Sequence, residues 1–262
     1  GKVKALSGAG GGHAGLPFPI GRAAATWCRD KERPAMLFMF DCDGVLVDSE
    51  VIAAEIDAEH LTRLGYPITP TEVIQRFAGL TVVELGRMVE SEMGRPLPGD
   101  FFTEQKAELD RRLARDLQPV AGVLALTEKI AGSRRCICSN SSGERLKMEL
   151  EKTGLYDFFA PDIFSAGEVG TREPKPSPNV YLHALSHFGV PAHEAVVIED
   201  SVFGVMAAKL SGARVIGFTG GRHTWPGHAD KLTEAGAETV INRMADLPAV
   251  AAAFKEWGGL VD

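Results

Sequence analysis

The chain has 262 residues, of which 45% are hydrophobic and 24% are charged, and its formal net charge is −7. This composition is typical of a globular protein and excludes a fibrous or wholly disordered chain. The acidic balance disfavours nucleic acid as a partner, because duplex binders carry a basic stripe, and no apolar run approaches the roughly 20 residues of a membrane span. We expect a monomer with neither a nucleic-acid nor a membrane partner.

Residues 1–34 precede the first predicted strand and lack the unbroken apolar stretch of a signal peptide. Within them, SGAGGGHAG (residues 7–15) superficially resembles a glycine loop for nucleotides. Such a loop requires a hydrophobic strand before it and a helix after it, and the flanking residues predict neither. We therefore interpret residues 1–34 as a flexible leader or a segment added for expression.

The cysteine pattern gives no sign of a zinc site or a disulfide framework. The four cysteines are Cys28, Cys42, Cys136 and Cys138, and none of them forms a CxxC pair. Reduced thiols of this kind favour a cytoplasmic protein.

The first strong strand covers residues 35–40, AMLFMF. Its uniformly apolar sequence is expected for a strand that is covered on both faces of a parallel sheet. The strand runs directly into Asp41-Cys42-Asp43-Gly44. Because alternate residues of an extended chain share a face, Asp41 and Asp43 are expected side by side. Gly44 lets the chain turn sharply just afterwards.

Residues 49–117 predict helices only, with no convincing strand among them. Helix starts are signalled at Ser49, at Thr69-Pro70 with Glu72, at the capping box Thr81 with Glu84, and at Asp100. We interpret this stretch as a small helical insert.

After Pro119 the predicted elements alternate between helix and strand. The expected strands are residues 135–138, 163–164, 195–198, 214–218 and 239–241. The expected helices are 121–131, one capped by Ser141 or Ser142, 178–188, 202–210 and one ending near Trp257. This alternation predicts an α/β fold with a doubly wound parallel sheet, formed by residues 35–48 and 118–262, with residues 49–117 inserted.

Ligands bind such sheets at the carboxyl ends of the strands, near the reversal of strand order. The polar groups at predicted strand ends are Asp41 with Asp43, Ser139 with Asn140, and Glu199 with Asp200. Neighbouring carboxylates repel one another unless a cation or a proton intervenes, and Mg²⁺ accepts carboxylate and phosphate oxygens. Taken alone, the two aspartates of residues 41–44 could equally be solvated acids in a loop.

Four motifs of the chain resemble those of the haloacid dehalogenase superfamily. They are FDCDGVLVDSE (40–50), CSNSS (138–142), KPSP (175–178) and VVIEDSVFGVMAA (196–208). The order and spacing also match, and the resemblance covers residues 36 to about 250. It implies a three-layer core with an α-helical cap between the first and second motifs, where the insert at 49–117 lies. The closest likeness is to the β-phosphoglucomutase-like and sugar-phosphate phosphatase subfamily.

The resemblance also implies roles for individual residues. Asp41 would be the nucleophile, and Asp43 would protonate the leaving oxygen and then activate water. Ser139 would hydrogen-bond the phosphoryl group, and Lys175 would neutralise charge on the phosphoryl group and on Asp41. Gly44 and Asn140 would contact the substrate, and Arg76 would either touch an anionic part of the substrate or form a salt bridge on a cap helix. Mg²⁺ would be held by Asp41, Asp43 through its backbone carbonyl, Asp200, and Glu199 directly or through another ligand.

The presence of Asp43 favours one reaction class within the superfamily, because expelling an alkoxide needs a proton and expelling a halide does not. We therefore expect a Mg²⁺-dependent phosphatase that hydrolyses small phosphorylated metabolites, of which sugar phosphates such as 6-phosphogluconate are the leading class. The alternative is a sugar phosphomutase, whose usual histidine is replaced here by Ala53. A non-catalytic relative would be expected to lack one of the acids or the lysine. Residues 220–230, GGRHTWPGHAD, form a loop after a core strand; a surface loop is the favoured interpretation, and a loop that borders the active site is the alternative.

Overall fold

The computed structural model describes residues 36–77, 80 and 82–258. The expected leader at 1–34, Cys28 and the capping box at Thr81 lie outside the described residues. Among the residues described, no helix is both long and apolar enough to cross a membrane. The three cysteines in this part of the chain, Cys42, Cys136 and Cys138, are buried and free.

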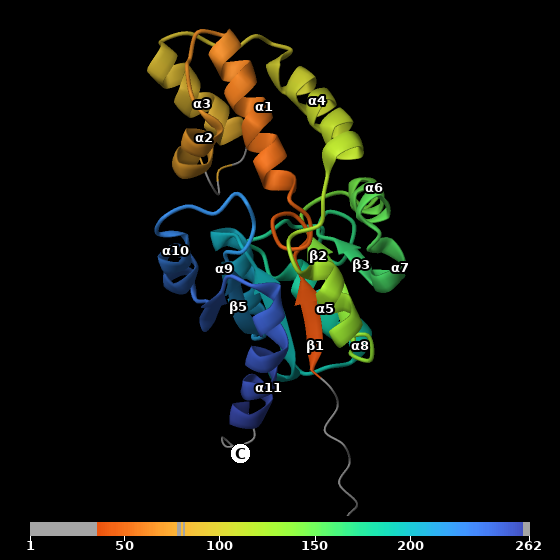
Figure 1. Cartoon of the computed structure of the whole chain (residues 1–262). Coiled ribbons are helices and arrows are strands. Elements are labelled where there is room, and N and C mark those ends of the chain that lie inside the picture. Colours follow the sequence, from red (N-terminus) through yellow and green to blue (C-terminus); the bar gives the residue numbers. More distant parts are fainter. Residues whose placement is uncertain (1–35, 78–79, 81, 259–262) are drawn as a thin grey trace, which may run out of the picture. The chain divides into compact units, whose positions relative to one another are not determined.

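A parallel sheet forms the centre of the fold (Figure 1). Its strands are β1 (Leu37–Phe40), β2 (Arg135–Ser139), β3 (Ile163–Ser165), β4 (Ala195–Glu199), β5 (Arg214–Phe218) and β6 (Thr239–Ile241). The spatial order is β3-β2-β1-β4-β5-β6, and every pairing is parallel. The chain moves from β1 to one edge and then returns to the other side of β1 as β4. The order therefore reverses between β1 and β4, which is where ligands bind in such sheets.

Alternating side chains of the strands build two separate hydrophobic layers. Phe38, Phe40 and Ile198 pack on one face, and Leu37 and Met39 pack on the other. The first face is covered by α5 (Val123–Lys129), α6 (Gly143–Thr153), α7 (Tyr156–Phe159) and α11 (Leu247–Gly258). The second is covered by α8 (Asn179–Phe188), α9 (Val202–Ser211) and α10 (His228–Ala235). The three-layer α/β core expected from the sequence is confirmed.

The predicted elements of the core are confirmed with small shifts of their ends, and Ser142 caps α6 by accepting a hydrogen bond from Arg145 N. The short helix α7 and the helix α10 were not predicted. Two short 3₁₀ helices, η1 (Ala192–Glu194) and η2 (Met244–Asp246), were not predicted either. Helix α10 begins inside the segment interpreted as a surface loop, because its glycine- and proline-rich start carries no helical periodicity.

The described residues between β1 and α5 form four helices: α1 (Ser49–Arg63), α2 (Pro70–Phe77), α3 (Val82–Met93) and α4 (Phe101–Asp116). We call residues 49–116 the helical segment. It has a hydrophobic cluster of its own, which includes Leu61, Phe77 and Val89. The Thr69–Glu72 start signal is confirmed, because Thr69 N donates to Glu72 Oε2 at 2.8 Å and Glu72 N donates to Thr69 Oγ1 at 3.2 Å.

The expected side-chain caps of α1 and α4 are corrected by the structure. Ser49 is the first helical residue rather than the cap, and its hydroxyl donates to Asp43 Oδ1 at 2.5 Å. Asp100 does occupy the N-cap position of α4, but its side chain makes no capping hydrogen bond. Ser49 therefore links the start of α1 to the polar end of β1.

Candidate active site

Three buried carboxylates meet where β1 and β4 end. Asp41 follows β1, Glu199 is the last residue of β4, and Asp200 follows it. Asp41 N donates to Ile198 O at 3.0 Å, which holds the two strand ends together. Each of the three residues offers a carboxylate oxygen, and these oxygens lie within 4.8 Å of one another. Parallel pairing thus brings together acids that are almost 160 residues apart in the sequence.

Lys175 is the cation inside this group. Its Nζ donates to Asp41 Oδ1 at 2.7 Å and to Glu199 Oε1 at 2.5 Å. Its side chain is 3% exposed. Burial lowers the pKa of Lys175, but the charges of Asp41 and Glu199 outweigh burial and raise the pKa above its usual value. Lys175 therefore carries a positive charge in contact with two buried acids.

Two asparagines position the backbone that carries Lys175. Asn140 Oδ1 accepts a hydrogen bond from Lys175 N at 2.9 Å. Asn179 Nδ2 donates to the carbonyl oxygens of Ala166, Val169 and Glu173 at 3.1, 3.0 and 3.2 Å. The loop before Lys175 is thereby tied to the first turn of α8. Asn140 was expected to contact substrate, and its side chain holds this loop.

Four protein groups donate hydrogen bonds to the buried Glu199 carboxylate. Besides Lys175, Oε1 accepts from the Tyr181 hydroxyl at 2.9 Å. Oε2 accepts from Ser201 N at 3.1 Å and from Ser201 Oγ at 3.0 Å. A Cβ added at Gly204 would lie 1.8 Å from Glu199 Oε1, so no larger residue fits there without displacing the carboxylate. Because these hydrogen bonds fix the Glu199 carboxylate, it can hold Lys175 in a defined orientation.

Burial and neighbouring acids disfavour the ionised form of Asp41. Burial raises the pKa of Asp41 well above its usual value, and the charges of Glu199, Asp200 and Asp43 add to that effect against the opposing charge of Lys175. A divalent cation at this position would relieve the repulsion. The available donors are carboxylate oxygens, which are the ligands that Mg²⁺ prefers. The residues therefore fit a Mg²⁺ ion held by Asp41 and Asp200.

The Asp43 carboxylate contacts other residues than the Asp41 carboxylate does. Its carboxylate accepts hydrogen bonds from Ser49 Oγ at 2.5 Å, from Ser141 Oγ at 2.7 Å and from Arg145 Nη2 at 3.1 Å. Burial raises the pKa of Asp43, but Arg145 and the hydrogen bonds from Ser49 and Ser141 outweigh it and lower the pKa. Asp43 is therefore ionised in this arrangement.

The partners of Asp43 were missed by the sequence analysis. Ser141 lies two residues after Ser139 in CSNSS, so its position next to a candidate residue was the available signal. Arg145 carried no such signal. Its Nε donates to the fully buried Glu149 at 2.6 Å, which directs the guanidinium toward Asp43.

Ser139 and Gly44 also lie at the ends of the central strands. Ser139 is 1% exposed, and its Oγ accepts a hydrogen bond from Ser141 N at 3.0 Å, so its own proton remains available to donate. Gly44 has a φ of +76°, which L side chains rarely adopt. A Cβ at Gly44 would lie 2.0 Å from Asp200 Oδ2, so the chain passes directly against this carboxylate.

Arg76 does not join the carboxylate group. Its Nη2 donates to both carboxylate oxygens of Glu92 at 2.7 and 2.8 Å, and the two side chains are 41% and 44% exposed. Arg76 therefore forms an exposed ion pair between α2 and α3.

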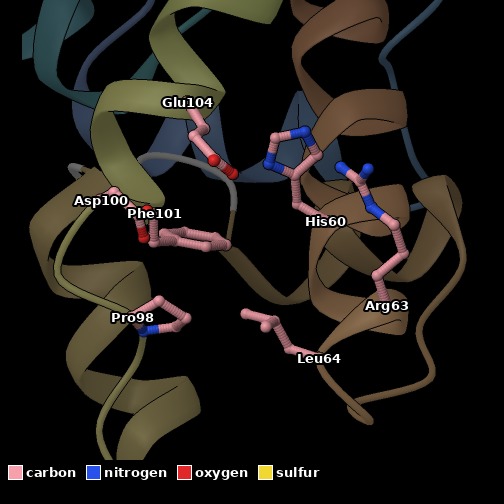
Figure 2. Close-up of a pocket in the computed structure, with 7 residues that line it drawn as sticks. All are labelled: His60, Arg63, Leu64, Pro98, Asp100, Phe101 and Glu104. Carbon is pink, nitrogen blue, oxygen red and sulfur yellow. The ribbon is translucent and has the colours of Figure 1, made fainter.

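A pocket of about 80 Å³ lies within the helical segment (Figure 2). Figure 2 shows His60 of α1 turned toward Phe101 and Glu104 of α4. The ring of His60 meets that of Phe101 edge-on, with centroids 6.1 Å apart. None of the strand-end carboxylates lines this pocket, so it belongs to the packing of the helices.

Comparison with known proteins places this geometry in a family. The model of the haloacid dehalogenase-like hydrolases matches residues 38–218, a span that contains every candidate residue named above. The chain belongs to this family. This haloacid dehalogenase-like hydrolase is 29% identical over 195 residues to the 6-phosphogluconate phosphatase of Escherichia coli K12. The match covers 74% of this chain and 87% of that relative. The expected family and the phosphatase class are thereby confirmed.

Solved structures resemble this hydrolase over most of its length. A conserved haloacid dehalogenase-like protein of unknown function from Agrobacterium tumefaciens C58 is 50% identical, with a TM-score of 0.81, and the match covers 84% of this chain and 99% of that one. A family member from Deinococcus radiodurans R1, solved with bound phosphate and sodium, is 29% identical with a TM-score of 0.74, covering 85% and 97% of the two chains.

Proposed function

We propose that this hydrolase is a Mg²⁺-dependent phosphatase of small phosphorylated metabolites, with sugar phosphates as the leading class, and that it acts through an aspartyl-phosphate intermediate on Asp41. The observation that carries the proposal is Lys175, which contacts Asp41 and Glu199 at 2.7 and 2.5 Å beside Asp200. Phosphoryl transfer requires mainly positioning and charge neutralisation, and this group supplies both. The E. coli relative named 6-phosphogluconate phosphatase supports the substrate class.

In the first step, Asp41 attacks the phosphorus, and the bond to the leaving oxygen breaks as Asp43 gives that oxygen a proton. Ser139 and Lys175 hold the phosphoryl oxygens. Bound Mg²⁺, held by Asp41, Asp200 and the Asp43 carbonyl, would neutralise phosphoryl charge. In the second step, Asp43 takes a proton from water, and the water oxygen attacks the phosphorus and releases Asp41.

The hydrogen bonds of Asp43 determine which of the two reaction steps its protonation state suits. With Ser49, Ser141 and Arg145 around it, its pKa is lowered and the ionised form is favoured. That form suits the second step, in which Asp43 acts as a base. To act as an acid in the first step, Asp43 has to leave Arg145 and take up a proton. We propose that the helical segment is a cap over the site and that movement of α1, which carries Ser49, accompanies this change.

The proposal is tested by measuring phosphate release from sugar phosphates, phosphoglycolate, nucleotides and pyrophosphate, with either Mg²⁺ or EDTA present. We expect release that requires Mg²⁺ and is fastest with a sugar phosphate, because the carboxylate group repels a phosphate anion unless a cation is bound. Release that is unchanged in EDTA would contradict the metal dependence.

The same samples separate the phosphatase from the sugar phosphomutase. A mutase would convert one sugar phosphate into its isomer in the presence of a bisphosphate activator, without accumulation of free phosphate. The alanine at position 53, where mutases of the resembled subfamily usually carry histidine, supports the phosphatase. Isomer without free phosphate would reverse this preference.

We predict that Asp43→Asn lowers turnover of sugar phosphates by about 10²–10⁴-fold, which is the usual contribution of a general acid and base. The loss should depend on the leaving group. With p-nitrophenyl phosphate, whose leaving group needs no proton, the variant should still form the aspartyl phosphate on Asp41 and give a burst of nitrophenolate before turnover stalls. Stopped-flow absorbance measures the burst. Equal first-step losses for alkyl and aryl substrates would contradict the role of Asp43 as the acid.

A further inference from the structure

His223 lies against a proposed metal ligand, in the segment for which the sequence favoured a surface loop over a loop that borders the active site. The segment between β5 and α10 turns inward, and His223 Nε2 lies 2.8 Å from Asp200 Oδ2. The side chains of His223 and Asp200 are 8% and 6% exposed. An imidazole in this position donates its Nε2 proton to the carboxylate. The loop thus reaches the same strand ends as Asp41 and Lys175.

The end of the same segment also hydrogen-bonds the backbone of Asp200. His228 Nε2 lies 2.6 Å from Asp200 O, and its Nδ1 lies 2.9 Å from Thr224 Oγ1. Trp225 stacks on the His228 ring with centroids 3.9 Å apart. Two imidazoles therefore hold residue 200, one through the carboxylate and one through the carbonyl.

Close packing leaves the His223 ring little freedom to turn. A Cβ added at Gly44 would lie 2.8 Å from His223 Cε1, and one added at Gly221 would lie 2.7 Å from both Cε1 and Nδ1. His223 Nδ1 is buried and has no hydrogen-bond partner among the described residues. Because one ring nitrogen is without a partner, the contact with Asp200 is the polar interaction that orients this imidazole.

We propose that His223 is a positioning residue that fixes the rotamer of Asp200, occupying Oδ2 and leaving the other carboxylate oxygen for Mg²⁺. The inference rests on the proposed Mg²⁺ site. Hydrogen bonds to metal-ligating carboxylates commonly contribute 10–100-fold to metal affinity, because an unrestrained carboxylate loses freedom when the ion binds. The loop after β5 is therefore part of the metal site.

The test compares His223→Gln with His223→Asn. The amide nitrogen of glutamine reaches about as far as Nε2 and can still donate to Asp200, whereas that of asparagine reaches only as far as Nδ1. We expect Mg²⁺ affinity, measured by calorimetry on the metal-free protein, to fall about 10–100-fold in His223→Asn and only a few-fold in His223→Gln. His183→Asn is the matched control, because His183 of α8 packs on Phe164 of β3 with ring centroids 4.9 Å apart.

Thermal unfolding with and without Mg²⁺ separates positioning from mere packing. In the positioning role, His223→Asn loses most of the rise in unfolding temperature at a Mg²⁺ concentration near the wild-type Kd, since the stabilisation grows with the logarithm of 1 + [Mg²⁺]/Kd. If His223→Asn does not fold, His223→Ala with added imidazole replaces it, and recovery of Mg²⁺ affinity on adding imidazole is the expected result. Equal Mg²⁺ affinity in wild type, His223→Asn and His223→Gln would overturn this inference alone. Failure of the wild type to bind Mg²⁺ would overturn the proposed function as well.

Discussion

Asp41→Asn is expected to abolish Mg²⁺-dependent phosphate release, with a loss on the order of 10⁴-fold or more, because the amide cannot replace the attacking carboxylate. Asparagine has nearly the same shape as aspartate, so the substitution removes the nucleophile and leaves the volume unchanged. Steady-state phosphate release from the best sugar phosphate measures the loss.

The fold itself is expected to tolerate Asp41→Asn. The pKa of Asp41 is raised by burial and by the neighbouring acids Glu199, Asp200 and Asp43, which means that the folded protein disfavours its charged form. A neutral amide avoids that cost, and Lys175 keeps its contact with Glu199 at 2.5 Å. We therefore expect the unfolding temperature of the metal-free variant to equal or exceed that of wild type. Activity above a hundredth of wild type in a correctly folded variant would remove Asp41 from the role of nucleophile.

Lys175→Met is expected to remove activity and also to destabilise the protein by about 3–5 kcal/mol, the usual cost of leaving a buried ion pair with one partner missing. Methionine fills a similar volume but provides no charge. Glu199 is fully buried and the Asp41 side chain is 12% exposed, so water compensates only in part for the lost ammonium group. The free energy of unfolding, measured in urea on metal-free protein, gives the cost.

Lys147→Met on α6 is the matched control for that loss. Lys147 is 59% exposed, and its Nζ lies 3.8 Å from Glu151. Exposed substitutions of this kind usually change stability by less than about 0.5 kcal/mol. The double variant Asp41→Asn with Lys175→Met should cost less than the sum of the single changes, because the amide removes one of the stranded charges. A Lys175→Met protein as stable as Lys147→Met would mean that these acids are not charged in the folded state.

The sheet and the strand-end acids could be predicted because their signals are local. Apolar runs such as residues 37–40 and 195–198 form covered parallel strands, and alternation with helices then places their carboxyl ends along one edge. Asp41, Ser139 and Glu199 follow from that rule. The start of α2 could also be predicted, because its signal is local: Thr69 and Glu72 exchange hydrogen bonds within a single turn.

The partners of those acids could not be predicted, because each is set by packing between distant segments. Arg145 reaches Asp43 across 102 positions, and its direction depends on the buried Glu149. Ser49 was expected to cap α1, yet its hydroxyl contacts Asp43 instead. For Arg76 the sequence left substrate contact and a salt bridge on a cap helix open, and the partner Glu92 depends on how α2 and α3 pack.

The sequence by itself determined the α/β class, the strands, and the acids, serine and lysine expected to carry the chemistry, because short-range patterns of hydrophobicity and motif spacing encode them. Only the tertiary structure decided that Lys175 contacts Asp41 and Glu199 together, and that His223 and His228 hold Asp200. The glycine-rich loop at 220–227 carries no periodic signal. Its inward path follows from close approaches at Gly44 and Gly221, which exist only once β1, β4 and β5 are assembled.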